Sequence, residues 1–263
     1  MGFEADALTY ANYELLRAAC PELTSRRGLV ESLRAVKEPE ELDAIRRATD
    51  VTNRTYEALA EEQFGGRTEK ELVWRMTELF HEHGGDEPAF AIDIAAGPTA
   101  STPHAVPGDR IVQEGDLVLV DAGAKVAQYC SDCTRTFAVG EVSDSLREIY
   151  EVTRRAQQAG VEAVGPGATG RDADAAARAV IAEAGYGENF GHGLGHGIGL
   201  LVHEAPNLRP ESTDALAAGN VVTVEPGIYL SGVGGVRIED LVFVTDGGCE
   251  VLTSFPKELL TVS

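Results

Sequence analysis

The chain has 263 residues, of which 43% are hydrophobic and 25% are charged, as is typical of a globular protein with a substantial core. Its 22 basic and 43 acidic residues give a formal net charge of −21, which argues against a nucleic acid or an anionic membrane surface as a partner. No apolar run is long enough to cross a bilayer and the first residues lack the pattern of a secretory signal, so we expect a cytoplasmic protein.

Residues 1–36 differ in pattern from the rest of the chain. They begin with the stretch "GFEADALTYANYELLRAACPEL", which is typical of one strand and one helix, and continue as a polar linker. We therefore predict a boundary at this point. Residues 1–36 would be the end of an earlier domain plus its linker, and residues 37–263 would form the main domain.

Capping residues and glycines predict four helices in the main domain. Thr68 and Glu71 form the pattern of a capping box, and Ser145 and Glu148 repeat it. Glycines that follow the apolar periodicity mark the expected ends of the helices. The predicted helices cover residues 40–59, 68–83, 145–159 and 172–184, and Gly160 would end the third.

Strand patterns fill the intervals between these helices. Each helix pair is followed by a histidine-bearing segment and then by apolar strands, so the same order occurs twice. This order predicts an α+β fold of two similar halves, with a site where the halves meet. The predicted strands cover residues 90–96, 116–124, 129–140, 220–230 and 235–244.

The four cysteines include a CxxC pair, Cys130 and Cys133, which a redox or zinc site could explain. The surrounding residues are typical of a strand, in which positions 130 and 133 point to opposite faces and cannot share one metal ion. We therefore expect all four cysteines to be reduced, structural thiols.

Two pairs of carboxylates stand at the ends of apolar runs. Asp121 ends "LVLV", and a hairpin centred near Val126-Ala127 would place Asp132 opposite it. Glu225 follows "VVTV", and a hairpin centred on Gly232, in "SGVGG", would place Glu239 opposite it. Each pair alone could be two solvated acids, but a carboxylate at the end of a buried strand needs a partner or a cation.

Three histidines lie in "NFGHGLGHGIGLLVHEAP", residues 189–206, and they are His192, His196 and His203. Four carboxylates with an imidazole form a mostly hard ligand set, suited to two divalent ions such as Mn²⁺, with Co²⁺ or Zn²⁺ possible. Two such ions about 3.5–4 Å apart activate a water molecule for hydrolysis.

Taken together, these motifs resemble the pita-bread metallopeptidases, specifically the branch of Xaa-Pro aminopeptidases and prolidases. The resemblance extends over about residues 30–254, and the motifs occur in the family's order. It implies a pita-bread fold with two pseudo-symmetric helix-helix-strand halves around a curved antiparallel sheet. It also implies that residues 1–36 are the remnant of an N-terminal creatinase-like domain, and that the protein forms a homodimer.

The resemblance also implies a role for each site residue. Asp132 and Glu239 would bridge both metal ions. The complete set of implied ligands is Asp121, Asp132, His196, Glu225 and Glu239. The implied substrate-contacting and proton-handling histidines are His104, His192 and His203. Arg237 shares a strand face with Glu239 and would orient that carboxylate, whereas Thr223 and Tyr229 could assist or simply pack.

The implied activity is hydrolysis of Xaa-Pro bonds, at the N-terminus of peptides or in dipeptides. Glu225 would carry the proton of the water molecule to the leaving nitrogen, and His203 would stabilise the oxyanion. His104 and His192 would hold the peptide. Arg209 is either an anchor for the carboxylate of a dipeptide or a solvated loop residue.

The sequence also allows other functions. A methionine-aminopeptidase-like enzyme shares the histidine motif but resembles the stretch "GGVRIEDLV" less. Creatine amidinohydrolase shares the fold but lacks these ligands. A catalytically dead pita-bread module that binds proteins would be expected to have lost ligands. His81 and His83, at the end of a predicted helix, are expected to be surface residues.

Overall fold

A computed structural model describes all residues, Met1–Ser263, and the chain divides into two units after Arg34. The first unit, Met1–Arg34, contains β1 (Gly2–Glu4), α1 (Tyr10–Ala19) and β2 (Thr24–Arg26), and β1 pairs with β2 in parallel. The helix α2 (Leu29–Ala35) follows. The second unit, Ala35–Ser263, contains all the residues that the motifs single out.

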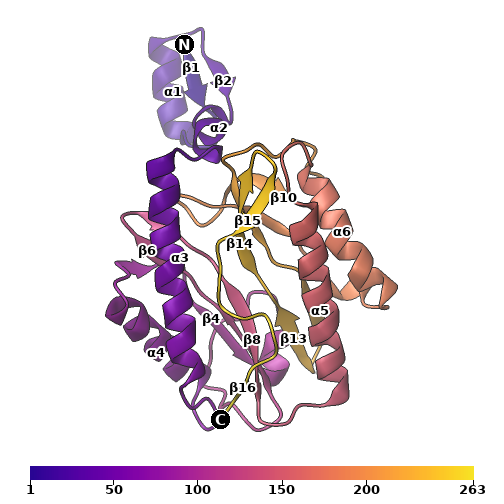
Figure 1. Cartoon of the computed structure of the whole chain (residues 1–263). Helices are drawn as coiled ribbons and strands as arrows, with labels where there is room; N and C mark the ends of the chain where they lie inside the picture. The colour runs from indigo at the N-terminus through magenta and orange to yellow at the C-terminus, as the bar shows by residue number, and fades with distance from the viewer. The chain divides into compact units, whose positions relative to one another are not determined.

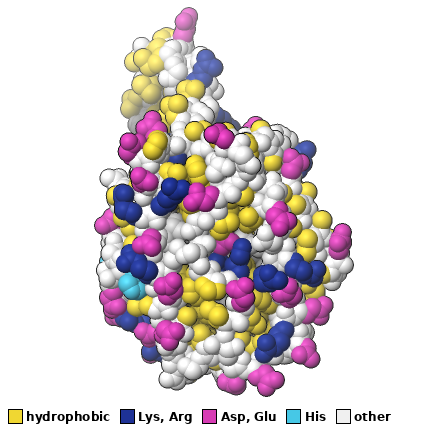
Figure 2. Space-filling model, in the orientation of Figure 1, with side chains coloured by type: hydrophobic (Ala, Val, Ile, Leu, Met, Phe, Trp, Pro, Cys, Tyr) yellow, Lys and Arg dark blue, Asp and Glu magenta, His cyan; other side chains and the backbone are white.

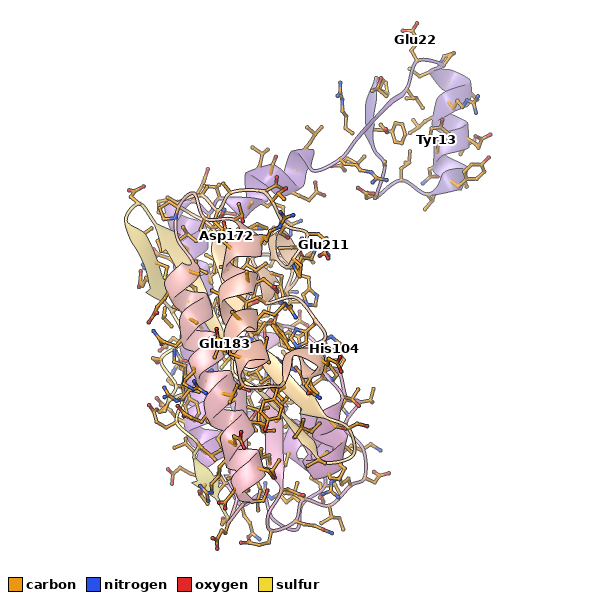
Figure 3. All side chains as sticks on the ribbon, turned by 90° about the vertical axis from the view of Figure 1, so that its right-hand side faces the viewer. Tyr13, Glu22, His104, Asp172, Glu183 and Glu211 are labelled. Atoms are coloured by element: carbon orange, nitrogen blue, oxygen red, sulfur yellow. The ribbon has the colours of Figure 1, made fainter.

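Four long helices frame the second unit, and each corresponds to a predicted helix. In Figure 1, α3 and α4 lie along one side of the strands and α5 and α6 along the other. Asp172 and Glu183, labelled in Figure 3, lie toward the two ends of α6. The helices are α3 (Pro39–Ala60), α4 (Glu69–Glu82), α5 (Asp144–Ala163) and α6 (Gly170–Glu183), with short 3₁₀ helices η1 (Gly97–Ser101) and η2 (Gly187–Asn189).

The capping box that was predicted at Thr68 is present: its side chain accepts from the amide of Glu71, and the Glu71 side chain accepts from the amide of Thr68. The start of α5 differs from the prediction. Its N-cap is Ser143, which accepts a hydrogen bond from the amide of Leu146, so Ser145 lies inside the first turn. The prediction chose the later of two serines that both precede the apolar periodicity.

The predicted end of α5 at Gly160 is also wrong, because the helix continues to Ala163. Gly160 is buried in the helix, and a Cβ placed there would lie 2.9 Å from a methyl of Val224 and 3.1 Å from one of Leu194. The glycine therefore serves close packing of α5 on the strands and does not end the helix.

The strands of the second unit form several small sheets. A five-stranded sheet has the order β10-β9-β11-β14-β15 and a four-stranded sheet the order β16-β8-β5-β4. The smaller sheets are the hairpin β12-β13 and the group β3-β6-β7. Their bounds are β3 (Glu87–Pro88), β4 (Asp93–Ala96), β5 (Leu117–Asp121), β6 (Ala124–Val126), β7 (Tyr129–Cys130), β8 (Thr134–Val139), β9 (Gly195–Gly197), β10 (Glu204–Leu208), β11 (Val221–Val224), β12 (Gly227–Leu230), β13 (Gly234–Arg237), β14 (Asp240–Thr245), β15 (Gly248–Val251) and β16 (Thr261–Val262).

The two halves repeat one arrangement of strands. In the first half β5 pairs antiparallel with β8, and the hairpin β6-β7 extends from this pair. In the second half β11 pairs antiparallel with β14, and the hairpin β12-β13 extends from it. Each half also has its own cluster of buried apolar side chains, one between α3, α4 and the first strands and one between α5, α6 and the later strands. The α+β class is therefore confirmed.

The register of the second hairpin is as predicted. Leu230 pairs with Gly234, and Val224 pairs with Asp240, so the turn is centred on Gly232, whose φ is +72°. Glu225 and Glu239 interrupt the two strands at matching positions. The continuous strands predicted over 220–230 and 235–244 are thus each divided in two at a glutamate.

The register of the first hairpin differs from the prediction. Asp121 pairs with Thr134, and Val126 pairs with Tyr129, so Ala127 and Gln128 form the turn. Both of these residues have positive φ, 49° and 71°. Neither is a glycine, and the sequence therefore lacked the usual signal for a turn of this kind.

The strand predicted over residues 129–140 is broken between Cys130 and Thr134. Cys130 is in β7 and Cys133 lies after it, both buried, and neither forms a disulfide. Cys20 and Cys249 are also free thiols, so the prediction of reduced cysteines agrees with the structure. No helix in the chain is long and apolar enough to span a membrane.

The two serines before α5 provide a direct test of the observed cap. Replacing Ser143 by alanine removes the acceptor for the Leu146 amide and should lower the free energy of unfolding by about 0.5–2 kcal/mol. Ser145→Ala, the matched control, should change it by less than about 0.5 kcal/mol. Urea denaturation measures both. A larger loss for Ser145→Ala than for Ser143→Ala would contradict this assignment.

Candidate metal centre

A cavity of about 480 Å³ opens where the two halves of the second unit meet. Its wall carries an unusual concentration of acids and imidazoles, with few apolar side chains among them. The titratable groups that line it are Asp93, His104, Asp121, Asp132, His192, His196, His203, Arg209, Glu225 and Glu239.

The carboxylates reach this cavity from points where strands end. Asp121 is the last residue of β5, and Asp132 lies between β7 and β8. Glu225 directly follows β11, and Glu239 directly precedes β14. The apolar residues of these strands are buried in the core, so the carboxylates are held at its edge by strands that cannot shift without exposing apolar surface.

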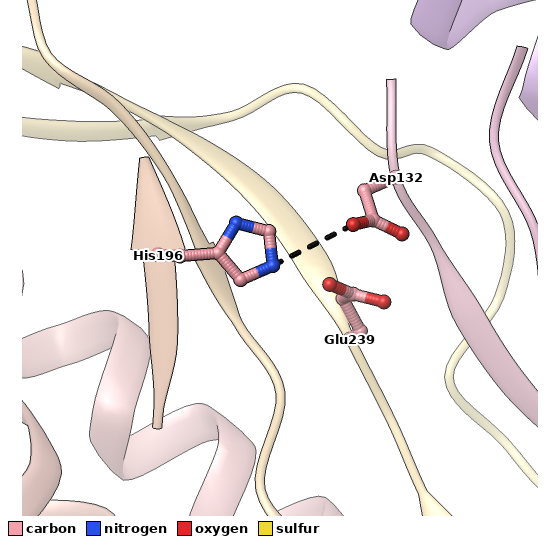
Figure 4. A group of neighbouring side chains, drawn as sticks. All are labelled: Asp132, His196 and Glu239. Carbon is pink, nitrogen blue, oxygen red and sulfur yellow. Dashed lines mark ion pairs between the residues drawn. The ribbon is translucent and has the colours of Figure 1, made fainter. Parts of the chain in front are cut away.

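Three of these side chains come within the range of one metal ion. Asp132, His196 and Glu239 each present a ligand atom, and these atoms lie within 4.8 Å of one another (Figure 4). The His196 Nε2 atom is 3.7 Å from Asp132 Oδ2 and 3.2 Å from Glu225 Oε1. Asp121 lines the same cavity and joins the group through Arg237.

The tautomer of His196 follows from its hydrogen bond. The Nδ1 atom lies 3.1 Å from the carbonyl oxygen of Gly197, which can only accept, so Nδ1 carries a proton. In the neutral ring Nε2 is then unprotonated and directed at the carboxylates. This is the arrangement that a histidine takes as a metal ligand.

Two threonines hold the glutamates in place. The Thr134 hydroxyl donates to Glu239 Oε2 at 2.8 Å, and the Thr223 hydroxyl donates to Glu225 Oε1 at 3.1 Å. Thr223 also accepts from the amide of His196 at 3.0 Å. One side chain therefore fixes the relative position of His196 and Glu225.

Arg237 connects the two carboxylate pairs. The guanidinium is buried, and it donates to Asp121 Oδ2 at 2.5 Å, to Thr134 Oγ1 at 3.1 Å and to the hydroxyl of Tyr229 at 2.8 Å. It lies 4.0 Å from Glu225 Oε2. Arg237 therefore forms a hydrogen bond with Asp121 itself, whereas it is linked to Glu239 only through the hydroxyl of Thr134.

His192 is held at the other end of this chain of hydrogen bonds. Its Nε2 atom is 3.0 Å from the Tyr229 hydroxyl, and its Nδ1 atom is 2.8 Å from the carbonyl oxygen of Gly193. Because Arg237 already donates to the tyrosine oxygen, the Tyr229 hydroxyl is free to donate to Nε2. His192 is therefore a neutral imidazole with both nitrogens in use, and burial lowers its pKa.

The electrostatics of the cluster indicate a need for cations. Burial first, and then the neighbouring carboxylates, raise the pKa of Asp132 and of Glu239 well above their usual range. Burial alone would raise the pKa of Glu225 too, but the hydrogen bond and charge of protonated His196 outweigh it and lower that pKa, and the same contact raises the pKa of His196. A bound metal ion would take the place of that proton on Nε2. The free-energy cost of burying these ionised carboxylates is therefore only partly offset by interactions within the protein.

Two buried carboxylate oxygens without hydrogen-bond donors indicate that the residues of this cluster are suited to bind metal ions. Asp121 Oδ1 and Asp132 Oδ1 are buried and have no hydrogen-bond partner in the protein. A buried carboxylate oxygen without a donor is strongly disfavoured, whereas a cation beside it removes the penalty. Oxygen and imidazole donors are the set that divalent ions such as Mn²⁺ accept.

The other histidines divide between this cavity and the surface. His203 lines the cavity, and its ring packs edge-on against His196 with centroids 4.3 Å apart. His104 lines it too, from an exposed loop that Figure 3 labels. His81 is exposed and His83 half-buried at the end of α4, and neither lines the cavity.

Asp93 is a cavity residue that the motifs did not single out. It is the first residue of β4 and pairs with Asp121 of β5. Burial, and then the charge of Asp121, raise the pKa of Asp93 to about 6. A charged residue inside the otherwise apolar stretch "FAIDIAA" was the signal available in the sequence, the same kind of signal that Asp121 gave.

Comparisons with known proteins identify the family of the chain. A model of metallopeptidase family M24 matches residues 43–246. An uncharacterized peptidase of Bacillus subtilis is 41% identical over 262 residues, which cover 99% of this chain and 74% of the relative. The Xaa-Pro dipeptidase of Pyrococcus furiosus is 41% identical over 232 residues, which cover 88% of this chain and 67% of the relative.

Solved structures give the same result at the level of the fold. An Xaa-Pro dipeptidase from Bacillus anthracis superposes with a TM-score of 0.96 at 44% identity, covering 99% of this chain and 74% of that chain. An X-Pro aminopeptidase from Thermotoga maritima superposes with a TM-score of 0.92 at 34% identity, covering 99% and 75%. The predicted pita-bread fold is confirmed.

Elemental analysis after metal reconstitution tests the centre. The unaltered chain should bind about two divalent ions. Asp132→Asn and Glu239→Gln should each lower this stoichiometry, because each variant replaces a charged oxygen ligand by a neutral amide. His196→Ala should also lose metal, whereas His203→Ala should retain it. His81→Ala serves as a surface control. A stoichiometry near zero for the unaltered chain, or equal loss in both cavity histidine variants, would contradict this assignment.

Proposed function

The chain belongs to metallopeptidase family M24, and on that premise we propose that it hydrolyses the bond between a first residue and a following proline, in Xaa-Pro dipeptides or at the N-terminus of peptides. The observation that carries the proposal is the convergence of four carboxylates and His196 on one cavity. The names of two relatives, the dipeptidase of Pyrococcus furiosus and that of Bacillus anthracis, support the choice of bond.

We propose two divalent ions as the cofactor, with Mn²⁺ as the first candidate and Co²⁺ or Zn²⁺ as alternatives. Asp132 and Glu239 would bridge the ions. The orphaned oxygens of Asp121 and Asp132 and the unprotonated Nε2 of His196 support these positions. The complete set of proposed ligands is Asp121, Asp132, His196, Glu225 and Glu239.

In this proposal Glu225 is the proton carrier. When bound, the ions polarise the scissile carbonyl and activate a water molecule. Glu225 accepts the proton of that water and delivers it to the leaving nitrogen. The hydrogen bond from Thr223 holds Oε1 of Glu225, and Oε2 lies 4.0 Å from Arg237 Nε, so the carboxylate is fixed in the wall of the cavity.

His203 is the proposed donor to the developing oxyanion. Burial and the neighbouring His196 lower its pKa, so it acts as a neutral imidazole whose N–H donates a hydrogen bond. His192 has both ring nitrogens engaged within the protein and therefore holds the peptide as a fixed part of the cavity wall. His104 contacts the substrate from its exposed loop.

Arg209 is the proposed element that distinguishes dipeptides from longer peptides. It lines the cavity but is exposed, and its Nε atom lies 3.9 Å from Glu211 Oε2. A weak surface ion pair of this kind is easily exchanged for another anion. The free carboxylate of an Xaa-Pro dipeptide is such an anion.

Two alternative functions remain testable. A methionine-aminopeptidase-like enzyme would cleave after an initial methionine and would not require proline as the second residue. A catalytically dead module would bind peptides without turnover, which the intact set of five metal-binding side chains disfavours. Hydrolysis of Ala-Pro, compared with Met-Ala, separates all three.

We also propose that the protein is a homodimer. The first unit exposes several large apolar side chains: Tyr10 is 76% exposed, Leu15 71% and Leu33 78%. Figure 2 shows hydrophobic side chains on the surface of this unit. Burying apolar surface contributes about 25 cal/mol per Å², and contact with a second copy would bury it. The cytoplasmic localisation predicted from the sequence stays a prediction.

Kinetics on metal-loaded protein test the activity. With Mn²⁺ the unaltered chain should hydrolyse Ala-Pro, and His203→Ala should lower kcat by about 10²–10³-fold while it retains metal. Arg209→Ala should raise KM for Ala-Pro more than for a longer peptide that begins with Ala-Pro. His81→Ala should behave as the unaltered chain does. Absence of any Xaa-Pro hydrolysis by fully metal-loaded protein would refute the proposed function.

Light scattering tests the homodimer. Leu15→Lys should shift the protein toward monomer, since it places a charge in the exposed apolar surface. Trp74→Lys is the matched control, because Trp74 is also 71% exposed but lies on α4. A monomeric unaltered chain, or a dimer that neither substitution weakens, would show that residues 1–36 do not form the contact.

A further inference from the structure

We propose that Asp93 binds a positively charged ammonium group on the first residue of the substrate. The inference deepens the proposed function and rests on it for the identity of the substrate. Nothing in the sequence motifs assigns Asp93 a role, and it is not one of the five proposed metal ligands.

The position of Asp93 is fixed by its strand. Asp93 pairs with Asp121 across β4 and β5, so the two side chains project from the same face of the sheet. The neighbours on either side of it, Ile92 and Ile94, are buried and point the opposite way into the core. Asp93 itself is half-buried and lines the cavity.

Three of the other cavity carboxylates have a hydrogen-bond donor within the protein. Asp121 accepts from Arg237, Glu225 accepts from Thr223, and Glu239 accepts from Thr134. The fourth, Asp132, is a proposed bridging ligand of the metal ions, which would supply its counter-charge. By contrast, the carboxylate of Asp93 has neither a hydrogen bond nor an ion pair with any residue.

The nearby cations do not supply the missing partner. The donors of Arg237 are directed at Asp121, Thr134, the Tyr229 hydroxyl and the carbonyl oxygen of Pro103. His104 lies on the exposed loop and makes no ion pair with Asp93. Because no side chain donates to this half-buried carboxylate, its partner must come from a molecule in the cavity. A cation that can donate a hydrogen bond is the partner that a carboxylate binds most favourably.

An Xaa-Pro substrate offers such a cation at its first residue. Every unblocked substrate has an α-ammonium group there, and a lysine in first position adds a side-chain ammonium group. Both have the same chemistry. Asp93 pairs with Asp121 and lines the same cavity as the proposed metal centre, so a substrate whose scissile bond lies at that centre has its first residue within reach of Asp93.

Steady-state kinetics distinguish the two sources. Ala-Pro, Lys-Pro and norleucine-Pro are compared on the unaltered chain and on Asp93→Asn, with Asp246→Asn, an exposed acid outside the cavity, as the charge-matched control. Loss of a charged hydrogen bond should raise KM by about 10- to 100-fold. A rise on all three substrates identifies the α-ammonium group, and a rise on Lys-Pro alone identifies the side chain. Unchanged KM on all three, or loss of bound metal or of kcat alone, overturns the proposal.

Calorimetry keeps the inference separate from the activity. Binding of alaninamide and lysinamide to the metal-loaded protein needs no hydrolysis, so it can be measured even if Xaa-Pro substrates are not cleaved. Asp93→Asn should weaken binding of both amides, or of lysinamide alone, according to the source of the cation. Equal binding to Asp93→Asn and to the unaltered chain overturns the role of Asp93, whatever the outcome for the proposed function.

Discussion

Mutual repulsion among buried carboxylates is the constraint on which this structure depends. Asp132 and Glu239 are almost fully buried, Asp121 and Glu225 lie beside them, and each would prefer water to such neighbours. Within the protein these carboxylates are stabilised by one buried guanidinium, that of Arg237, by the imidazole of His196 and by two threonine hydroxyls. The fold must therefore hold the acids in place by other means, and the rigid strands on either side of them do so, because moving a carboxylate outward would pull apolar residues from the core. Divalent cations then complete the neutralisation that the side chains leave unfinished.

The sequence predicted those features that depend on residues close together in the chain. Caps and glycines predicted all four long helices, and the acids at the ends of apolar runs predicted where the cavity groups would gather. The second hairpin was predicted in register because Gly232 marks its turn. The failures occurred where packing decides. Gly160 was predicted to end its helix, but it lies inside the helix and allows close contact with Val224. Ser143 and Ser145 were both possible N-caps in the sequence, and only the hydrogen bond to Ser143 in the structure identifies the N-cap.

The first hairpin and Asp93 show a second limit of the sequence. The turn at Ala127 and Gln128 takes positive φ without a glycine, so no turn residue marks the centre, and the predicted register differed from the observed one. Asp132 nevertheless reaches the cavity, because it lies in the break between β7 and β8 and not in a regular strand. Asp93 carried the same signal as Asp121, an acid in an apolar stretch, but it lacked a partner of its own kind nearby in the sequence. Only the pairing of β4 with β5 brings the two together.

Two buried arginines join the halves of the second unit in opposite directions. Arg237, from the second half, donates to Asp121 of the first. Arg135, from β8 in the first half, donates to Asp240 of the second at 2.8 Å and to the backbone oxygen of Glu239. Removing Arg237 would leave Asp121 without its counter-charge, a change that typically destabilises a protein by about 3–5 kcal/mol. Asp240 would still have Lys257, whose Nζ atom lies 2.8 Å from Asp240 Oδ2, if Arg135 were removed. Because Glu239 precedes Asp240 directly in the chain, the contact that joins the halves also sets the position of a proposed bridging ligand.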